Sequence, residues 1–538
     1  MKRVVHVLLA SVLIVGLLLT ACAKPAPSPT PTGKPAPAPT TAPPTTPKAT
    51  PTPKAPSADT PQYGGVFKIA GGAAPRALLP QFEPIKNLFM HPAFETLLRL
   101  DEKGDLAPWL ATDWKLSPDQ KSLTLTLRKG VKFHDGTDFN AAAAKFSIEL
   151  RKEAGFGDYQ TLQSIDVIDD YTLRLNLSQF QNTLLTSLWY LAGMMSSPTN
   201  YKKFSKDDAK WQPMGTGPFK FITYEINTIA RWERFDGYWQ KGKPYLDGFQ
   251  SFVINDATTR DLALRKGEIL ANEQVENRLL PELEKLGFAI IVAPVEVYNV
   301  LVPDSANPDS PYANKKVREA LEYAIDREAI VKALGYGRME ALYQMAPAGN
   351  YAYIPDLKGR RYDVAKAKQL LAEAGYPNGF KTTFHTLFSI ADSLVAVSNS
   401  FKAIGIEATI DVGDPGKFFG LTQQGWKNGL IFRAFRIPPD WLQFTYSYVS
   451  PKSIESKSML RPAGFEDLLQ KALTAPDMPS KKAASQEVVQ KLYDEATVLP
   501  LWGSQSSLVH SKNVHNLGYY LPWGANKLWS PADLWLSK

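Results

Sequence analysis

One aromatic-rich segment in the last quarter of the chain carries the side chains best suited to binding a small molecule. Arg433 and Arg436 could pair with a carboxylate or a phosphate, and Asp440 could pair with an ammonium group. Phe435 and Trp441 offer ring faces for an apolar group or a sugar. Such aromatic residues can equally form a core, but a core does not house unpaired arginines, so the interleaving favours the lining of a cleft. With two aromatic residues further upstream, the candidate ligand-binding residues are Tyr298, Phe388, Arg433, Phe435, Arg436, Asp440 and Trp441.

The residue types of enzyme active sites are present, but they do not occur in catalytic spacings. His134 and Asp135 could act as a catalytic or metal-binding pair. The alternative is the end of a hairpin, because a Phe-His-Asp-Gly turn, in which Gly136 takes an unusual φ, precedes the helix-like stretch Asn140–Glu149. The six histidines show no metal-binding spacing, and no Gly-x-Ser-x-Gly, phosphate-loop or His-Glu-x-x-His motif occurs. We therefore expect no catalytic residue, no metal site and no cofactor.

The only cysteine, Cys22, ends an N-terminal segment with the character of a signal peptide. Lys2 and Arg3 precede the nearly unbroken apolar run Val4–Leu19 of 16 residues, which is shorter than the roughly 20 residues of a permanent membrane helix. The run ends in Leu-Thr-Ala-Cys, which resembles a bacterial lipobox, where the cysteine receives a diacylglycerol and becomes the first mature residue. We expect residues 1–22 to be a lipoprotein signal peptide with Cys22 as the lipidation site. The alternative is an ordinary signal peptide with an incidental cysteine.

A proline-rich linker is expected over residues 23–62. Of the 38 residues from Lys24 to Pro61, 14 are proline and few are apolar, so this segment should be an extended tether that reaches at most roughly 120 Å. The first 62 residues hold six lysines and arginines against one aspartate, so most of the net charge of +8 lies outside the globular part. Because nucleic-acid binders concentrate basic residues on a folded face, we expect no nucleic-acid partner.

The remaining chain mixes strand and helix signals. Alternating apolar residues predict strands over Ser122–Leu127 and Tyr171–Leu177. Helical spacing predicts a helix over Val364–Ala374, and Asp326 and Ser480 have the character of N-caps of two further helices. A chain of 538 residues is too long for one core. Since no regular β-α-β repeat is visible, we expect a mixed α/β (α+β) fold with more than one lobe.

Six short motifs follow one another along this part of the chain. They are Tyr-Gly-Gly-Val-Phe at 63–67, Phe-Glu-Thr-Leu-Leu at 94–98 with Gly-Asp-Leu-Ala-Pro-Trp-Leu-Ala-Thr-Asp-Trp at 104–114, Leu-Arg-Lys-Gly-Val-Lys-Phe-His-Asp-Gly at 127–136, Gly-Thr-Gly-Pro-Phe at 215–219, Val-Arg-Glu-Ala-Leu with Ala-Ile-Asp-Arg at 317–327, and the segment 365–377 that ends in Gly-Tyr-Pro. In this order they resemble the motifs of family 5 of the extracellular solute-binding proteins, which includes oligopeptide-, dipeptide- and nickel-binding proteins. Each motif alone is weak, but the ordered set covers Tyr63 to about Trp502.

The resemblance implies a two-lobed clamp of the periplasmic-binding-protein type (type II-like) with an additional third domain. Transferred to this chain, the expected parts are lobe I over 63–98, 199–295 and 500–538, domain II over 99–198, and lobe III over 296–499. In the family the Gly-Thr-Gly-Pro turn, here Gly215–Pro218, lies near the cleft. It is therefore either a rigid structural turn or a minor contributor to ligand binding.

The implied function is that of a substrate-binding receptor for an ABC importer, not an enzyme. Such a receptor captures a peptide, a peptide-like compound or another small solute between its lobes and delivers it to permease subunits with associated ATPases. We expect an extracytoplasmic, lipid-anchored monomer on the bacterial membrane. The alternatives are a secreted, membrane-anchored hydrolase, which would need a nucleophile and base in a cleft, and a sensory module of the same fold without a transporter. Neighbouring genes for two permeases and two ATPases would separate the receptor from the sensory module.

The resemblance also bears on the charge of the ligand. In the peptide-binding members, a carboxylate three residues before an Asp-Pro pair binds the ammonium group of the ligand. Here that register places Phe435 at the carboxylate position and Pro438 at the Asp of the pair, and Asp440 follows. A buried ammonium without a counter-charge is costly, so we expect no free peptide amine there. Arg433 and Arg436 instead favour an anionic group, or a sugar stacked on the nearby tryptophan. If the register is several residues off, Asp440 recovers the amine-binding role.

Overall fold

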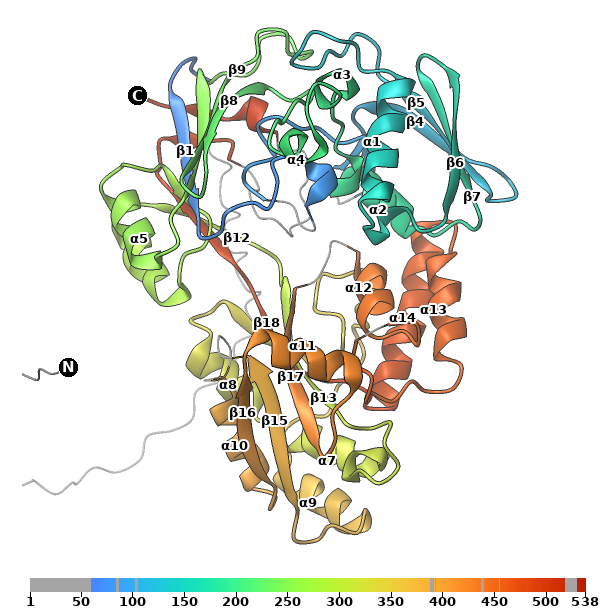
Figure 1. Cartoon of the computed structure of the whole chain (residues 1–538). Coiled ribbons are helices and arrows are strands. Elements are labelled where there is room, and N and C mark those ends of the chain that lie inside the picture. The colour runs from blue at the N-terminus through green and yellow to red at the C-terminus, as the bar shows by residue number, and fades with distance from the viewer. Residues whose placement is uncertain are drawn as a thin grey trace, which may run out of the picture. The chain divides into compact units, whose positions relative to one another are not determined.

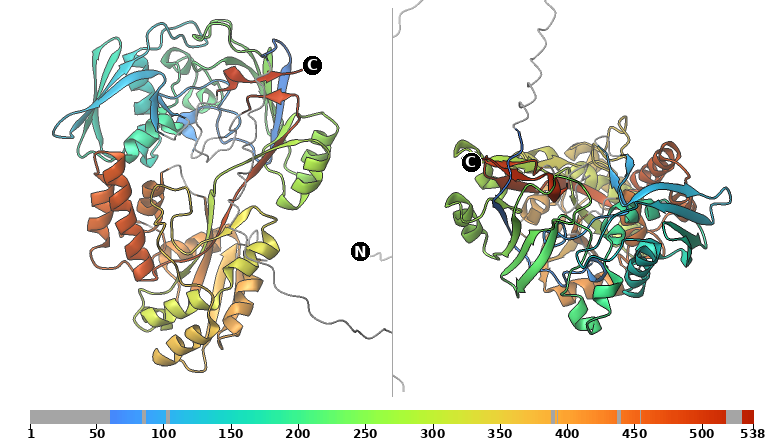
Figure 2. Two further views of the ribbon diagram at one scale, coloured as in Figure 1. Left: turned by 180° about the vertical axis from the view of Figure 1, so that it is seen from behind. Right: turned by 90° about the horizontal axis from the view of Figure 1, so that it is seen from above.

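The computed structural model describes residues 60–83, 87–101, 105–387, 391, 393–436, 440–453, 455–517 and 530–538. By their contacts these residues belong to one unit, Thr60–Lys538. Three β-sheets organise it, and we name its parts after them: lobe I has a seven-stranded sheet, domain II a four-stranded sheet and lobe III a six-stranded sheet (Figures 1 and 2). The expected signal peptide, Cys22 and most of the linker lie outside the described residues. Within those residues, no helix has the length and apolar character needed to cross a bilayer.

Lobe I is a mixed sheet in which β1 is parallel to both of its neighbours and the other pairs are antiparallel. In sheet order its strands are β12 (Ala289–Val292), β19 (Ser507–His510), β11 (Ala271–Asn272), β1 (Val66–Gly71), β10 (Gly248–Val253), β9 (Ile229–Arg234) and β8 (Phe219–Glu225). Its helices are α3 (Pro198–Tyr201), α4 (Lys206–Ala209), α5 (Ala257–Arg265) and α6 (Leu280–Lys285). Phe67, Ile69 and Phe249 are fully buried and form part of its core.

Domain II is an antiparallel sheet with one covered face. Its strands, in sheet order, are β4 (Ala111–Leu116), β5 (Ser122–Leu127), β7 (Thr172–Leu177) and β6 (Leu162–Asp169). The leucines of β5 and β7 point into a core that α1 (Ala141–Glu153) and α2 (Thr183–Trp189) help to form. The residues between them, such as Arg174, face away from that core. The alternation read from the sequence therefore gives the correct strands, because one face of the sheet is buried and the other is polar.

Lobe III buries both faces of its sheet. In sheet order its strands are β14 (Met339–Ala341), β18 (Leu499–Ser504), β13 (Val297–Pro303), β17 (Gly429–Arg436), β15 (Lys381–Leu387) and β16 (Glu407–Gly413). Its helices are α7 (Lys315–Ala324), α8 (Arg327–Leu334), α9 (Val364–Glu373), α10 (Leu394–Lys402), α11 (Pro415–Gln424), α12 (Trp441–Tyr448), α13 (Phe465–Leu473) and α14 (Met478–Asp494). Along β17, Leu430 and Phe432 pack against α7, α9 and α10, whereas Ile431 and Phe435 pack on the opposite face with α12–α14.

The smaller elements complete the unit. Two short sheets pair β2 (Leu98–Leu100) with β3 (Leu106–Pro108) and β20 (Val514–His515) with β21 (Trp535–Leu536). The 3-10 helices are η1 (Pro80–Phe82), η2 (Gly157–Tyr159), η3 (Leu191–Gly193), η4 (Asn277–Leu279), η5 (Pro311–Ala313) and η7 (Pro531–Asp533).

Two extended segments connect the sheets of lobe I and lobe III. One runs from β12 to β13 and the other from β18 to β19, and they pair with each other: the Ala293 N–H donates to the Ser506 carbonyl at 2.9 Å and the Glu296 N–H to the Ser504 carbonyl at 3.1 Å. Because β18 pairs with β13 along its length, the second crossing falls at Gln505–Ser506. The expected domain boundaries remain predictions. Mixed sheets in several parts confirm the expected fold class.

Candidate functional site

The end of β17 carries three of the predicted ligand-binding residues and brings them next to a fourth. Phe435 lies opposite Tyr298 of β13 in the ladder, and both side chains are almost completely buried. Their rings contact Phe444 of α12, with centroid distances of 5.3 Å and 5.8 Å. Phe435 and Tyr298 thus belong to one aromatic cluster beneath α12, which is a core position on the face of the sheet that this helix covers.

The two predicted arginines differ in their surroundings. Arg433 is nearly buried, forms an ion pair with Glu455, and lies 4.4 Å from the ring of Phe435. The reasoning that a core would not hold this arginine unpaired overlooked a partner 22 residues away. Arg436, in contrast, has a side chain that is 42% exposed, and its guanidinium lies 3.8 Å from the Glu296 carboxylate. Arg436 is therefore the better placed of the two to meet a solute.

Asp440 is the N-cap of α12 and the centre of a buried polar network. Its carboxylate accepts from the Leu442 N–H at 2.9 Å and the Tyr351 hydroxyl at 2.6 Å, and forms an ion pair with Lys481 at 2.5 Å. The Thr186 hydroxyl of domain II donates to it at 2.7 Å. Burial raises the pKa of the Asp440 carboxyl, but the Lys481 charge and the hydrogen bonds outweigh burial, so the pKa lies below its ordinary value. Sequence reasoning missed Lys481 because no pattern in α14 distinguishes it from its exposed neighbours.

The remaining two predicted aromatic residues are Trp441 and Phe388, and neither presents an exposed ring in the part of the chain that the structure describes. Trp441 is fully buried, and its indole Nε1–H donates to the Met345 carbonyl at 2.7 Å. In this conformation its ring belongs to the core of lobe III and offers no face for a sugar to stack on. Phe388 lies outside the described residues. The ligand-binding roles of the predicted set stay predictions.

Two buried glutamates, which sequence reasoning missed, lie where lobe I meets the crossing segments. Glu273 directly follows β11 and Glu296 directly precedes β13, and their side chains are only 6% and 3% exposed. Burial raises the pKa of both carboxyls to about 7, and the charge of Arg436 opposes the rise in each case. The only sequence signal was their position at the ends of apolar segments. The proximity of Glu296 to Arg436 depends on the pairing of β13 with β17, two strands far apart in the chain.

Domain II contacts lobe III on the side away from these crossings, where α2 lies beside α12 and α13 (Figures 1 and 2). The Asn182 backbone N–H donates to the Leu473 carbonyl at 2.8 Å, and its side-chain amide donates to the carbonyls of Ala472 at 2.8 Å and Ala475 at 3.2 Å. The Leu473 carbonyl is the last one of α13, where a helix leaves its carbonyls without a partner in the next turn. Lobe III is therefore held to the rest of the unit at both sides.

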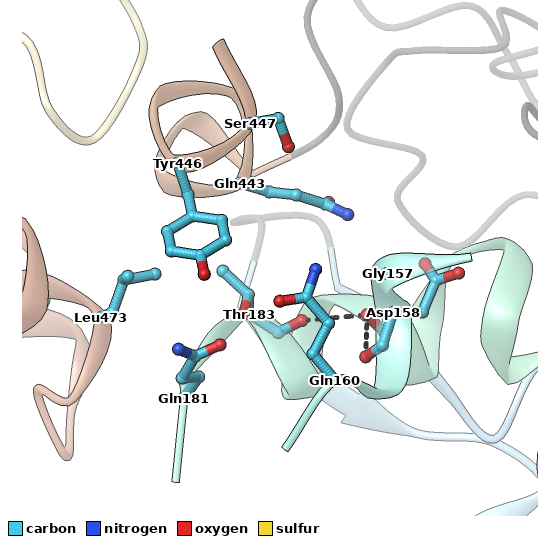
Figure 3. Close-up of a pocket in the computed structure, with 10 residues that line it drawn as sticks. Gly157, Asp158, Gln160, Gln181, Thr183, Gln443, Tyr446, Ser447 and Leu473 are labelled. Atoms are coloured by element: carbon cyan, nitrogen blue, oxygen red, sulfur yellow. Dashed lines mark hydrogen bonds between the residues drawn. The ribbon is translucent and has the colours of Figure 1, made fainter. Parts of the chain in front are cut away.

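A small cavity of about 120 Å³ opens at this contact (Figure 3). Its lining is mostly uncharged and polar, with Gln160 and Thr183 on the domain II side and Gln443 and Tyr446 of α12 on the other. A cavity of this size holds a few water molecules or a small group of a larger solute.

Three of the sequence motifs, 94–98, 127–136 and 215–219, meet in one tightly packed contact. Glu95 accepts hydrogen bonds from Thr216 at 3.0 Å, Tyr238 at 2.8 Å and Trp239 at 2.9 Å. Burial raises the pKa of the Glu95 carboxyl to about 7, although these donors oppose the rise. Gly215 packs so closely that a Cβ atom there would lie 2.0 Å from the Ala93 carbonyl oxygen. The Gly-Thr-Gly-Pro turn is thus built for close backbone packing.

His134 and Asp135 belong to the same packed contact. The His134 ring Nε2 lies 2.8 Å from the Gly217 carbonyl, and Asp135 accepts from the hydroxyls of Thr137 and Ser197. Burial lowers the pKa of His134 to about 4, so the ring is neutral at pH 7. Gly136 has φ +81°, as a hairpin end requires. Within the described residues no group of three or more His, Cys, Asp or Glu side chains could hold a metal ion.

The profile of bacterial extracellular solute-binding proteins, family 5 (middle region), matches residues 105–468, more than half of the chain. The chain belongs to this family. It is a substrate-binding protein of an ABC importer, acts outside the cytoplasm, and is not an enzyme. The family assignment agrees with the resemblance found in the ordered motifs.

Individual relatives of this family 5 protein extend over most of its length. The glutathione-binding protein GsiB of Salmonella choleraesuis (strain SC-B67) is 29% identical over 471 residues, which cover 82% of this chain and 88% of that protein. The periplasmic binding protein DppA from Helicobacter pylori, solved with the peptide STSA, is 25% identical with a TM-score of 0.71, covering 89% of this chain and 99% of that one. CtaP from Listeria monocytogenes, at 20% identity and a TM-score of 0.78, covers 89% and 100% and supports the fold alone.

Proposed function

We propose that this family 5 protein captures a peptide or peptide-like solute between lobe I and lobe III and passes it to the permeases of its importer. The similarity to a glutathione-binding protein over 82% of the chain carries the proposal for the solute class. The similarity to a binding protein solved with a tetrapeptide supports it. The solute lies beside Arg436, the ion-pairing residue that is more exposed than Arg433.

The geometry supports a clamp that closes by rotation of lobe III. Two extended segments cross between the sheets of lobe I and lobe III, and domain II adds hydrogen bonds through Asn182 and Thr186. Two crossings of extended backbone permit a hinge motion with small φ and ψ changes. The contacts of domain II can break without unfolding either part, because they join the surfaces of two separate cores.

We also propose that Cys22 carries a lipid that holds the receptor at the membrane. The proposal rests on the sequence: the only cysteine follows a short apolar run and a lipobox-like tetrapeptide. Each buried acyl methylene contributes about 0.8 kcal/mol, so two or three chains anchor a protein firmly. The proline-rich segment that follows would act as a tether to the folded unit.

Isothermal titration calorimetry of the full-length protein in mild detergent tests the solute class. We expect reduced glutathione or short peptides of three to five residues to bind with a dissociation constant in the micromolar range or below. Arg436→Ala should weaken that binding by about tenfold or more, because a hydrogen bond to a charged group contributes about 1.5–3 kcal/mol. Lys381→Ala is the matched control, because that lysine is 88% exposed at the start of β15, whereas Arg436 lies at the opposite end of the neighbouring parallel strand β17. Absence of binding by every peptide and by glutathione would refute the proposed solute class and leave the family unaffected.

A further inference from the structure

The contact between domain II and lobe III lies opposite the hinge of the proposed clamp. The two crossing segments join lobe I to lobe III at one side, and α2 of domain II lies beside α12 and α13 at the other (Figures 1 and 2). A rotation about the crossings displaces the far side of lobe III most, so this contact must break when the clamp opens. Its composition therefore decides how readily the clamp opens.

One half of the contact is a hydrogen bond to a carboxylate that has other partners. The Thr186 hydroxyl donates to Asp440 at 2.7 Å, and both side chains are buried. Within lobe III the same carboxylate accepts from the Tyr351 hydroxyl and the Leu442 N–H and forms an ion pair with Lys481. If Thr186 withdraws, Asp440 keeps these partners and its counter-charge. Opening therefore breaks one hydrogen bond here and leaves no buried charge unpaired.

The other half joins the start of α2 to the end of α13. Asn182 is the N-cap of α2, but its side chain makes no capping hydrogen bond within that helix. Instead its backbone N–H donates to the Leu473 carbonyl, and its side-chain amide donates to the carbonyls of Ala472 and Ala475. The Asn182 Oδ1 is buried and has no hydrogen-bond partner in the described part of the chain. That oxygen is costly while the contact is closed, and water satisfies it when the contact opens.

Water reaches this contact from the cavity of about 120 Å³ (Figure 3). The cavity is lined by Thr183, the neighbour of Asn182, and by Leu473, whose carbonyl accepts from Asn182. Water entering there can replace the hydrogen bonds of Asn182 and Thr186 as the two surfaces separate. The cores of domain II and lobe III are separate clusters, so neither core loses its packing. The contact thus has the properties of a reversible closure.

We propose that Asn182 and Thr186 form a latch that holds lobe III against domain II while the clamp is closed. This inference rests on the clamp motion of the proposed function and names the element that regulates it. Asp440 follows the end of β17 by four residues, so the latch is fastened to the segment that also carries Arg436. Because the latch stabilises the closed form itself, it raises the affinity for solutes of different chemistry by one common factor.

Hydrogen exchange of the Asn182 backbone amide tests the latch on the full-length protein without any solute. The first N–H groups of a helix have no acceptor within the helix, so this amide depends for protection on the Leu473 carbonyl of lobe III. We expect it to exchange at least about tenfold faster than amides in the centres of β5 and β13, which open only on deeper unfolding. Exchange as slow as in those strands would mean a permanent interface and would overturn the proposal.

Two substitutions weaken the two halves of the latch. Thr186→Val should speed exchange of the Asn182 amide by about tenfold, through loss of a hydrogen bond to a charged group. Asn182→Asp keeps a good N-cap for α2 but turns a carboxylate toward the carbonyls of α13. It should speed exchange there by about a hundredfold, after correction for the intrinsic rate of the new residue. Ser187→Ala is the matched control: this hydroxyl of α2 donates to the carbonyls of Asp158 and Thr183 within domain II, so exchange should not change.

Calorimetry with glutathione and trialanine separates the latch from the solute class. We expect Thr186→Val and Asn182→Asp each to weaken every solute that binds by a common factor of about threefold or more, and Ser187→Ala to weaken none. The inference is wrong if both latch variants keep the wild-type exchange, or if exchange speeds up while a bound solute keeps its affinity. If neither solute binds, the proposed solute class fails, and the exchange rates alone decide the latch.

Discussion

Replacing Asp440 by Asn distinguishes a structural carboxylate from a ligand-binding one. The substitution keeps the shape of the side chain and an oxygen that can accept from Tyr351, but it removes the charge that faces Lys481. The Lys481 side chain is 6% exposed and the Asp440 side chain 1%, so the lysine would be left as a buried, uncompensated cation. Removing one partner of such a pair costs about 3–5 kcal/mol, and we expect Asp440→Asn to lower the free energy of unfolding by that amount.

Urea denaturation followed by circular dichroism measures this cost. A double variant, Asp440→Asn with Lys481→Met, should recover most of it, because an apolar group in place of both charges removes the unpaired cation. Thr186→Val, which removes the hydrogen bond that Thr186 of domain II donates to Asp440 at 2.7 Å, should cost about 1–2 kcal/mol. The reasoning is refuted if Asp440→Asn costs less than about 1 kcal/mol and instead abolishes solute binding, since Asp440 would then be the amine-binding carboxylate of the family.

Three other perturbations follow from the structure. Cys22→Ser should release the protein from washed membranes or leave an unprocessed precursor, and mature protein in the membrane fraction would contradict the anchor. Glu273→Gln should stabilise the protein by up to about 3 kcal/mol at pH 8 and by little at pH 4.5. Burial raises the folded-state pKa of Glu273 from 4.5 to about 7. The folded protein therefore loses stability as Glu273 ionises between these two pH values, and the glutamine variant avoids that loss. If Glu273→Gln stabilised the protein equally at pH 4.5 and at pH 8, this explanation would be excluded. Gly215→Ala should destabilise the protein by about 2 kcal/mol or more, because the added Cβ atom would lie 2.0 Å from the Ala93 carbonyl oxygen. The control is Gly420→Ala, whose added Cβ atom has no atom within 4 Å, and this variant should be neutral or slightly stabilising.

Local patterns in the sequence predicted local structure well. The strand expected over Ser122–Leu127 is β5, and the helix expected over Val364–Ala374 is α9, which ends one residue earlier. Asp326 caps α8 through the Ala329 N–H, as expected. Ser480 does not cap α14: Asp477 does, and it accepts from the Ser480 N–H at 2.8 Å. That error arose because Pro479 is compatible with both starts: it lies in the first turn of the observed helix, and it would directly precede a helix capped by Ser480.

The site was harder to predict because its contacts join residues that are far apart in the chain. Lys481 lies 41 residues from Asp440, and Thr186 lies 254 residues before it. No local pattern encodes such a pair, so Asp440 was read as a free charge. Arg433 was misjudged for the same reason, since Glu455 neutralises it from a separate loop. Glu273 carried only the weak signal of its position at the end of an apolar segment, because burial at the end of a two-residue strand is decided by the tertiary packing around it.

The place of β19 in the lobe I sheet determines when that sheet can be completed. β19 lies between β12 and β11, and it pairs with both, yet it is translated after all of lobe III. As the chain emerges from its N-terminus, domain II and lobe III have all their own strands before β19 appears, and each can assemble from contiguous chain. Until then β11 has an unpaired edge and β12 has no partner strand. A nascent or truncated chain that ends before Ser507 therefore exposes an open sheet edge, which is a template for aggregation.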